Sequence, residues 1–295
     1  MSGPVVVGVD GSQSSLDAVS VAAREARLRQ CELKVVHAFI WPAMHVPLGP
    51  SSLGPADGGL RNMAEQLVAE AVERARSVAP EVEVSSAVVS GEALTVMEAQ
   101  SRTASLVVVG SRGMGGFVGL LVGSTAVHLA AHGRCPVLVV RGESDRTGPV
   151  LLGTDGSPAG ESAVEFAFEE ASLRGTGVTA LHAWTPWKVA APQPQDPAAP
   201  YALEPGMLAA GEERLLAEAV AGQRERYPEV TVEHSVVRGG AREALIEASE
   251  NAGLVVLGAR GRGGFTGLVL GSVSQALLHH AHCPVAVVRG SDASG

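Results

Sequence analysis

The chain has 295 residues, 46% of them hydrophobic, which is enough for one large core or two of ordinary size. Its formal net charge is −9 and Lys34 and Lys188 are its only lysines, so a broad nucleic-acid-binding surface is excluded. No apolar run reaches the roughly 18 residues of a membrane span, and the start MSGPVVVGVD lacks the charged beginning of a signal peptide, so we expect a cytoplasmic protein without a membrane span.

An internal repeat divides the chain into two halves. Residues 5–12, VVVGVDGS, recur as VLLGTDGS at 150–157, and residues 106–124 recur at 254–272. The offset is 145 residues between His37 and His182 and 148 residues between Pro80 and Pro228. The second half therefore carries three extra residues in the loop after its second strand, where a length change disturbs no core.

Within each half, short β-branched runs alternate with longer segments of helical period. In the first half this pattern predicts strands at 4–10, 32–39, 81–89, 105–110 and 136–141, and helices at 14–29, 59–79, 92–103 and 124–133, with Ser14 and Ser124 as N-caps or first-turn residues. The expected fold is α/β, with two tandem domains at 1–142 and 149–290, each a five-stranded parallel sheet with helices on both faces. The polar segment 143–148 is the expected linker.

A carboxylate follows the first strand of each half. Asp10 is followed by Gly11 and Ser12, and Asp155 by Gly156 and Ser157, at the edge of the sheet where doubly wound domains bind ligands. A carboxylate there can accept hydrogen bonds from adenine or ribose. A plain turn or helix cap explains Asp-Gly equally well, so the pair leaves both interpretations open.

A glycine-rich loop follows the fourth strand. Gly110 and Gly113 are followed after nine residues by Gly123 and Ser124, and the second half has the same spacing at Gly258, Gly261, Gly271 and Ser272. Glycines let a phosphate approach the backbone, and a helix N-terminus adds unpaired donors and partial positive charge. A flexible loop is the alternative, but two matches in register with the repeat favour a phosphate site.

This loop differs from a P-loop and from a dinucleotide-binding fingerprint, because it follows the fourth strand and has no Lys-Ser/Thr ending. Arg112, Arg260 and Arg262 are candidates for phosphate contacts, or are simply exposed loop residues. Met114 stands at the position that matches Arg262, so the two sites are expected to differ in affinity.

Each half resembles an ATP-binding universal stress protein domain, and the whole chain resembles the tandem members of that family found in actinobacteria. The resemblance implies a Rossmann-like, adenine nucleotide alpha hydrolase-like fold with two ATP per chain, with or without Mg²⁺. In the first half it implies nucleotide contacts at Gly8, Asp10, Ala38, Gly110, Ser111, Arg112, Gly113, Gly115, Gly116, Gly123, Ser124 and Thr125. In the second half the corresponding residues are Gly153, Asp155, Ala183, Gly258, Ala259, Arg260, Gly261, Arg262, Gly263, Gly264, Gly271, Ser272, Val273 and Ser274.

The histidines and serines indicate no catalytic or metal site. His128 and His132 are four residues apart on a helix, and His279, His280 and His282 cluster in the equivalent helix, but only His132 and His280 occupy matching positions. No Ser-His-Asp or Cys-His arrangement is readable. Cys31, Cys135 and Cys283 are expected to be core residues.

Three functions remain open on the sequence. The leading one is a nucleotide-dependent regulator of stress response or growth state that acts through occupancy. The alternatives are a slow ATPase or nucleotidyl-transfer enzyme, with Asp10 and Asp155 holding Mg²⁺, and a scaffold without nucleotide. The apolar last strand of each half is an edge that must be covered, and the resemblance implies that family domains pair through it and that chains form homodimers. The Pro-rich stretch 186–205, with Trp184 and Trp187, is expected to be a mobile loop near the second pocket and leaves an unidentified protein partner open.

Overall fold

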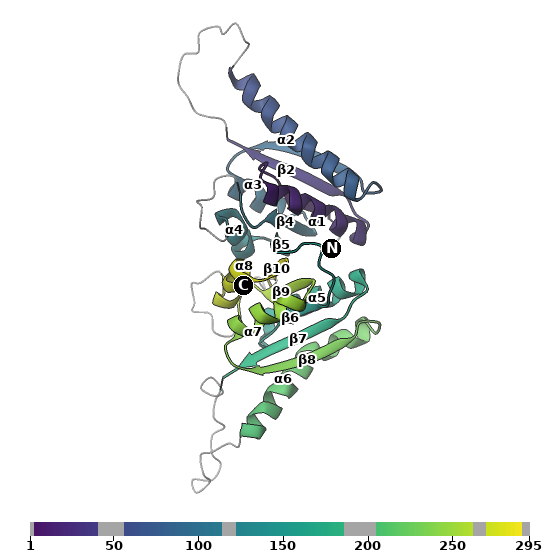
Figure 1. The fold of residues 1–295 in the computed structure, drawn as a ribbon, viewed down its shortest axis with the longest axis vertical. Coiled ribbons are helices and arrows are strands. Elements are labelled where there is room, and N and C mark those ends of the chain that lie inside the picture. The colour runs from purple at the N-terminus through teal and green to yellow at the C-terminus, as the bar shows by residue number, and fades with distance from the viewer. Residues whose placement is uncertain (1–2, 41–55, 114–121, 186–204, 262–269, 291–295) are drawn as a thin grey trace. The chain divides into compact units, whose positions relative to one another are not determined.

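The computed structural model describes residues 3–40, 56–113, 122–185, 205–261 and 270–290. The chain forms two compact units, residues 1–144 and residues 145–295, and the division falls inside the polar segment expected to be the linker. Each unit is a parallel α/β sheet with helices on its faces (Figure 1).

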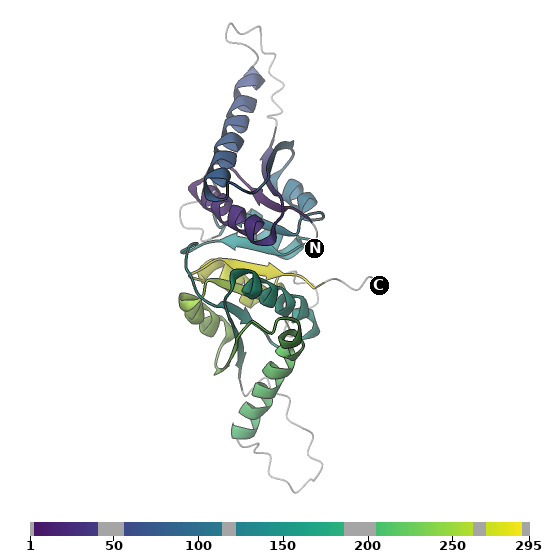
Figure 2. The ribbon, with the colours of Figure 1, turned by 90° about the vertical axis from the view of Figure 1, so that its right-hand side faces the viewer.

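The first unit has five parallel strands in the order β3-β2-β1-β4-β5. The strands are β1 (Val5–Gly8), β2 (Leu33–Phe39), β3 (Val84–Ser90), β4 (Leu106–Gly110) and β5 (Val137–Val140). The helices are α1 (Gln13–Arg29), α2 (Ala56–Val78), α3 (Ala93–Gln100) and α4 (Ser124–His132). Helices α1 and α2 pack against each other, as do α3 and α4, and the two pairs cover opposite faces of the sheet (Figure 2).

The second unit repeats this plan with the strand order β8-β7-β6-β9-β10, again all parallel. Its strands are β6 (Val150–Gly153), β7 (Val178–Trp184), β8 (Val232–Arg238), β9 (Leu254–Gly258) and β10 (Val285–Val288). Its helices are α5 (Glu161–Arg174), α6 (Pro205–Arg226), α7 (Ala241–Ala248) and α8 (Ser272–His280), with short 3-10 turns at Pro158–Gly160 and Ser249–Asn251.

The predicted fold class is confirmed, because parallel strands alternate with helices in each unit. Nearly every residue of β1, β4 and β5 is buried, which explains why these runs show no polar alternation. The third strand begins at Val84, three residues later than predicted, because the peptide that precedes it closes a turn in which Val82 N–H donates to Ala79 O. Among the described residues, no helix is both long and apolar enough to cross a bilayer.

The topology fixes where a ligand site can lie. Strands β1 and β4 are neighbours, but the connections that leave them turn to opposite faces of the sheet. The loops after these two strands therefore diverge and leave a crevice at the carboxyl edge. Strands β6 and β9 form the same switch point in the second unit.

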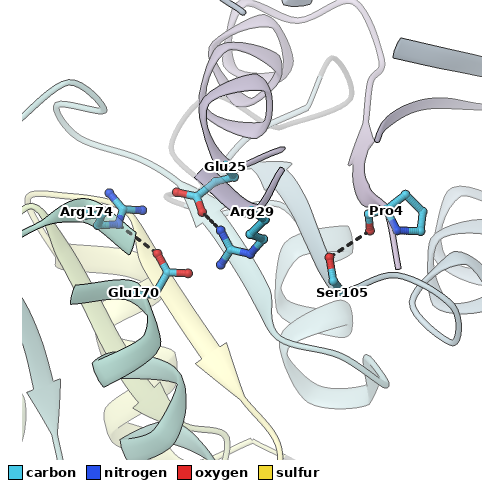
Figure 3. Close-up of polar contacts among 6 residues, drawn as sticks. All are labelled: Pro4, Glu25, Arg29, Ser105, Glu170 and Arg174. Atoms are coloured by element: carbon cyan, nitrogen blue, oxygen red, sulfur yellow. Dashed lines mark hydrogen bonds and ion pairs between the residues drawn. The ribbon is translucent and has the colours of Figure 1, made fainter. Parts of the chain in front are cut away.

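Each unit also buries one glutamate in the last part of its first helix. Glu25 on α1 and Glu170 on α5 are both 1% exposed, and each pairs with the arginine one turn later, Arg29 or Arg174 (Figure 3). In the first unit Ser105, just before β4, donates from Oγ to Pro4 O at 3.3 Å, which ties the starts of the two central strands together.

Two expectations about individual side chains can be checked. Cys135 and Cys283 are buried in the core as predicted, whereas Cys31, which follows the end of α1, is only partly buried. Burial raises the pKa of the Cys135 thiol to about 12. Trp184, expected to belong to a mobile loop, is instead the last residue of β7 and is 8% exposed. The rest of that loop, with Trp187, lies outside the described residues.

Candidate functional site

The turn after β1 is organised around the Asp10 carboxylate. Its Oδ1 accepts hydrogen bonds from Ser12 N–H at 3.0 Å and from Ser12 Oγ at 2.7 Å. Ser12 is also the N-cap of α1, accepting from Ser15 N–H at 3.2 Å. The cap is thus two residues earlier than Ser14, which lies in the first turn of the helix.

Ser12 and Ser14 connect this turn to the loop after β4. Ser14 Oγ accepts from Arg112 N–H at 3.3 Å, and Ser12 Oγ lies 3.4 Å from Arg112 O. Ser111, which is buried, donates from its backbone N–H to Val140 O at 2.9 Å. Two loops about 100 residues apart in sequence are therefore held together by serine hydroxyls.

Glycines allow close approach where the two loops meet. A Cβ on Gly113 would lie 2.5 Å from Asp10 Oδ2, and a Cβ on Gly110 would lie 2.6 Å from Ser14 O. The second unit has the same approach, because a Cβ on Gly261 would lie 2.5 Å from Asp155 Oδ2. The sequence predicts the aspartates and the glycine loops in the same region, and the structure brings them into direct contact in both units.

Helices α4 and α8 begin at the crevice with glycine as N-cap. Neither Gly123 nor Gly271 supplies a side-chain cap, so first-turn N–H groups of both helices lack a side-chain acceptor from the cap residue. The N–H of Gly123 donates to Ser111 O at 2.8 Å and that of Gly271 to Ala259 O at 2.7 Å, which places each cap beside the loop of the preceding strand.

The residues that follow these caps differ in orientation and surroundings. Ser124 and Ser272 are exposed at the first helical position, and Thr125 and Val273 are half-buried. Ser274 is buried and donates from Oγ to Gly258 O at 2.7 Å, so its hydroxyl supports the end of β9. The sequence alone does not reveal this role.

The turn after β6 keeps the aspartate but loses the serine network. Asp155 Oδ1 accepts from Ser157 N–H at 3.0 Å, as in the first unit. Ala159 and Gly160 stand where the first unit has Ser14 and Ser15. The Ser157 hydroxyl oxygen is buried and has no hydrogen-bond partner among the described residues.

The ends of the second strands carry a histidine before the predicted base-pocket alanine. Ala38 and Ala183 are both half-buried, in register with Val89 and Val237 of the neighbouring edge strands. The preceding residue, His37, lies with Nδ1 2.8 Å from Val9 O.

His182, the counterpart of His37, makes the same contact to Thr154 O at 2.9 Å, and its Nε2 also lies 2.7 Å from Glu212 Oε2. The residue of α2 that matches Glu212 is Ala64. Sequence reasoning does not find this pair, because 30 residues separate its members.

Gly8 and Gly153 end the first strands at sites crowded by the protein itself. A Cβ on Gly8 would lie 3.1 Å from Met97 Cε, and one on Gly153 would lie 2.4 Å from Leu257 Cδ2 and 3.0 Å from a methyl of Leu245. Packing against β9 and the helices α3 and α7 is therefore sufficient to explain these two glycines.

A cavity of about 520 Å³ opens beside the second turn, between α5 and α6. Its lining includes Thr154, Ser157 and two glycines of α6, Gly211 and Gly222. In the first unit the positions that match these glycines are Met63 and Arg74, and Arg74 donates from Nε to Ser20 Oγ of α1 at 2.8 Å. Helix α6 is therefore less closely packed on its neighbouring helix than α2 is.

Several predicted site residues lie outside the described part of the chain. These are Gly115, Gly116, Arg262, Gly263 and Gly264, together with Met114. Arg112 and Arg260, which border these gaps, are exposed.

The histidines of α4 form local contacts. His128 Nε2 lies 3.2 Å from Glu98 Oε2 on α3, and this hydrogen bond lowers the pKa of Glu98. His132 stacks on His128 with ring centroids 4.3 Å apart. Among the residues that the structure describes, no group of three or more His, Cys, Asp or Glu side chains is arranged to hold a metal ion.

These features define a class of protein: a tandem pair of Rossmann-like domains, each with a carboxylate that faces a glycine loop at the switch point of its sheet. The family model described as "Universal stress protein family" matches residues 1–141 and 147–289. The chain therefore belongs to the universal stress protein family.

Full-length relatives support this assignment. A universal stress protein of Mycobacterium tuberculosis strain H37Rv is 37% identical over 295 residues, covering 97% of this chain and 96% of the relative. One of Mycolicibacterium smegmatis is 40% identical over 295 residues with the same coverage. The crystal structure of a universal stress protein from Archaeoglobus fulgidus DSM 4304 shares the fold with a TM-score of 0.68 at 18% identity, covering 100% of this chain and 98% of that one.

Proposed function

We propose that each half of the chain binds one ATP in the crevice between the turn after its first strand and the loop after its fourth. The observation that carries this proposal is the repeated contact between an aspartate and a glycine: the Asp10 carboxylate against Gly113, and Asp155 against Gly261. The same two loops meet in the same way in both halves, although the surrounding side chains have diverged. A shared ligand is the simplest reason to keep this arrangement.

The N-termini of α4 and α8 are the proposed phosphate sites. Gly123 has φ −75° and ψ 155°, which any residue can adopt, and a Cβ there would meet no atom closer than 3.8 Å. The fold itself therefore does not require glycine at this position. A phosphate that approaches the backbone does require it, since first-turn N–H groups and the helix dipole attract an anion only when it can come close.

The remaining contacts follow from position. In this proposal Asp10 and Asp155 accept hydrogen bonds from a nucleoside hydroxyl or amino group, and the half-buried Ala38 and Ala183 contact the base. Bound ATP would connect the two loops of each half, because its nucleoside would contact the turn after the first strand and its phosphates the loop after the fourth. The protein would thereby change the surface of its carboxyl edge without breaking a bond.

We propose that occupancy, more than turnover, is the signal. Asp10 Oδ1 accepts two hydrogen bonds from Ser12, which fix the carboxylate at the proposed site. Fast phosphoryl transfer needs metal ligands, a group that orients the nucleophile and a cation on the phosphates. The proposed regulator acts as a homodimer, which the family resemblance implies, and light scattering with and without ATP would measure its mass.

The test replaces the two cap glycines. Gly123→Glu and Gly271→Glu place bulk and negative charge at the proposed phosphate positions, so each single variant should keep one site and the double variant none. Gly222→Glu is the matched control and should keep both sites, because Gly222 is an exposed residue of α6 where a Cβ would meet no atom within 4 Å.

Calorimetric titration with ATP should give two sites for the parent chain, and circular dichroism should show the fold retained in every variant. The fold should survive best at Gly123, because the Cβ of Gly271 would come 3.3 Å from Ala259 O. An unchanged ATP stoichiometry in the double variant would remove the phosphate assignment, and absence of binding by the parent chain would refute the proposal as a whole.

A further inference from the structure

The second half contains a buried histidine–glutamate pair at its proposed site, and the first half has Ala64 in place of the glutamate. The His182 side chain is 7% exposed and the Glu212 side chain 15% exposed, and their Nε2 and Oε2 atoms are 2.7 Å apart. His182 stands between two proposed nucleotide contacts: its Nδ1 holds the carbonyl of Thr154, the residue before Asp155, and Ala183 follows it in the chain. The pair therefore connects α6 to the turn that carries Asp155.

The geometry determines how many protons this pair holds. A backbone carbonyl only accepts, so His182 Nδ1 must carry a hydrogen to bond Thr154 O. A hydrogen bond between Nε2 and the Glu212 carboxyl then needs one more proton, bound either to the ring or to the carboxyl group. If that proton leaves, a ring lone pair faces a carboxylate in a buried place, which is unfavourable.

We infer that His182 and Glu212 are positioning residues that make nucleotide binding in the second half depend on a single proton, whereas binding in the first half lacks this dependence. The inference rests on the proposed function, because it concerns the same site. When the shared proton is bound, Glu212 holds the imidazole, and the imidazole holds the Thr154–Asp155 turn. When pH rises and the proton is lost, the contact to α6 breaks and the turn is less well positioned, so affinity falls.

The cavity between α5 and α6 makes this contact more important. Because open space lies beside Thr154 and Ser157, α6 has little packing against the second turn there. In the first half, Arg74 ties α2 to α1 and the serines tie the turn to the β4 loop. His37 makes the same contact to Val9 O in the first half, but the residue that matches Glu212 is Ala64, so this position of α2 supplies no carboxylate to the ring.

Asp155, in the turn that His182 contacts, is half-buried, whereas the other charged groups near His182 are exposed. On β8 the ring is in register with Val236, and the ionisable residues two positions away, His234 and Arg238, are exposed. The remaining charged residues near this end of α5 and α6, and those of α7, are also exposed: Glu161, Glu165, Glu213, Arg214, Glu218, Arg242, Glu243 and Glu247. Among the described residues, Glu212 is the ionic partner of His182 within 4.0 Å.

The test measures ATP affinity from about pH 6 to pH 9, the range around histidine titration. A Gly123→Glu chain keeps only the proposed site of the second half, and a Gly271→Glu chain keeps only that of the first. Comparing the two also controls for titration of ATP itself, which affects both sites equally. We expect affinity in the second half to fall about tenfold more than in the first as pH rises. Glu212→Ala should weaken ATP binding at the second site and remove its additional loss of affinity at high pH. Glu213→Ala, at the exposed neighbouring residue, should leave both the affinity and its pH dependence unchanged.

Glu212→Gln separates positioning from bulk structure. A glutamine amide can donate to Nε2 without titrating. Glu212→Gln should therefore restore the ATP affinity that Glu212→Ala loses at the second site, and this affinity should fall with pH no more than that of the first site. Equal pH profiles for the two halves of the parent chain, or a profile unchanged by Glu212→Ala, would overturn the inference.

A second measurement does not depend on ATP. In the absence of nucleotide, the difference in melting temperature between the parent chain and Glu212→Ala should shrink as pH rises, because the pair stabilises the fold only while it holds its proton. A difference that does not change with pH would refute the inference even if ATP binds. If ATP does not bind but this difference shrinks, the proposed function fails and the proton-dependent contact stands.

Discussion

The turns after β1 and β6 show two ways to hold the same aspartate. In the first half, Ser12, Ser14 and Ser15 fix Asp10 and connect its turn to the β4 loop. In the second half Ala159 and Gly160 replace two of these serines, while His182, which contacts the turn as His37 does in the first half, also meets Glu212 of α6. The backbone arrangement is common to both halves, but different side chains support it in each.

The largest expected effect concerns the buried Glu–Arg pair in the first helix of each half. Glu25→Ala should destabilise the first unit by about 3 kcal/mol or more, because it removes the carboxylate that pairs with Arg29, whose side chain is only 9% exposed. Glu170→Ala should cost less, since the Arg174 side chain is 26% exposed and can reach water.

Urea unfolding followed by circular dichroism would measure both free energies of unfolding. Glu81→Ala, which removes an exposed partner 3.9 Å from Arg27, is the control and should change little. Equal losses at Glu25 and Glu170 would show that exposure of the arginine does not decide the cost.

An intermediate effect is expected from the serine network. Ser14→Ala removes the acceptor of Arg112 N–H, and a lost hydrogen bond of this kind costs about 1 kcal/mol. ATP affinity should fall in the first half only, because Ala159 already occupies the matching position in the second half. Calorimetry on the Gly271→Glu and Gly123→Glu backgrounds would separate the two sites, and an equal loss in both would contradict a local role for the serine.

The smallest effect concerns acid stability. The hydrogen bond between the Glu98 carboxylate and His128 lowers the pKa of Glu98. A carboxyl group with a lowered folded-state pKa stabilises the fold above its ordinary pKa, and this contribution is lost as pH falls through the folded value. The second half has Ile246 and Ala276 at the matching positions.

Glu98→Gln should therefore make the stability of the first half slightly less sensitive to acid between about pH 5 and pH 3, the range of carboxyl titration. Thermal melts across this range would show it as a smaller decrease in melting temperature than in the parent chain. The shift should be small, since both side chains are partly exposed. A steeper decrease in the variant would show that the hydrogen bond does not act as inferred.

The strand and helix order was predictable because buried parallel strands and the repeat leave a strong pattern in the sequence. The pairing of Asp10 with Gly113 followed in outline from topology, since both residues come after neighbouring strands. The supporting contacts were not predictable. Ser14 meets Arg112 across 98 residues, and Glu212 meets His182 from a helix whose angle to the sheet no local pattern determines. Trp184 was misplaced because the Pro-rich composition after it obscured the end of β7.

Two domains on one polypeptide are free to diverge in a way that a symmetric assembly is not. In a dimer of identical single domains, each substitution appears in both binding sites at once. In this chain the two halves share a fold but differ in sequence. Glu212 could therefore arise in the second half while the matching residue of the first half is Ala64. With the two sites proposed above, one tandem chain would carry a site that responds to ligand alone and a site that responds to ligand and pH, always in a one-to-one ratio.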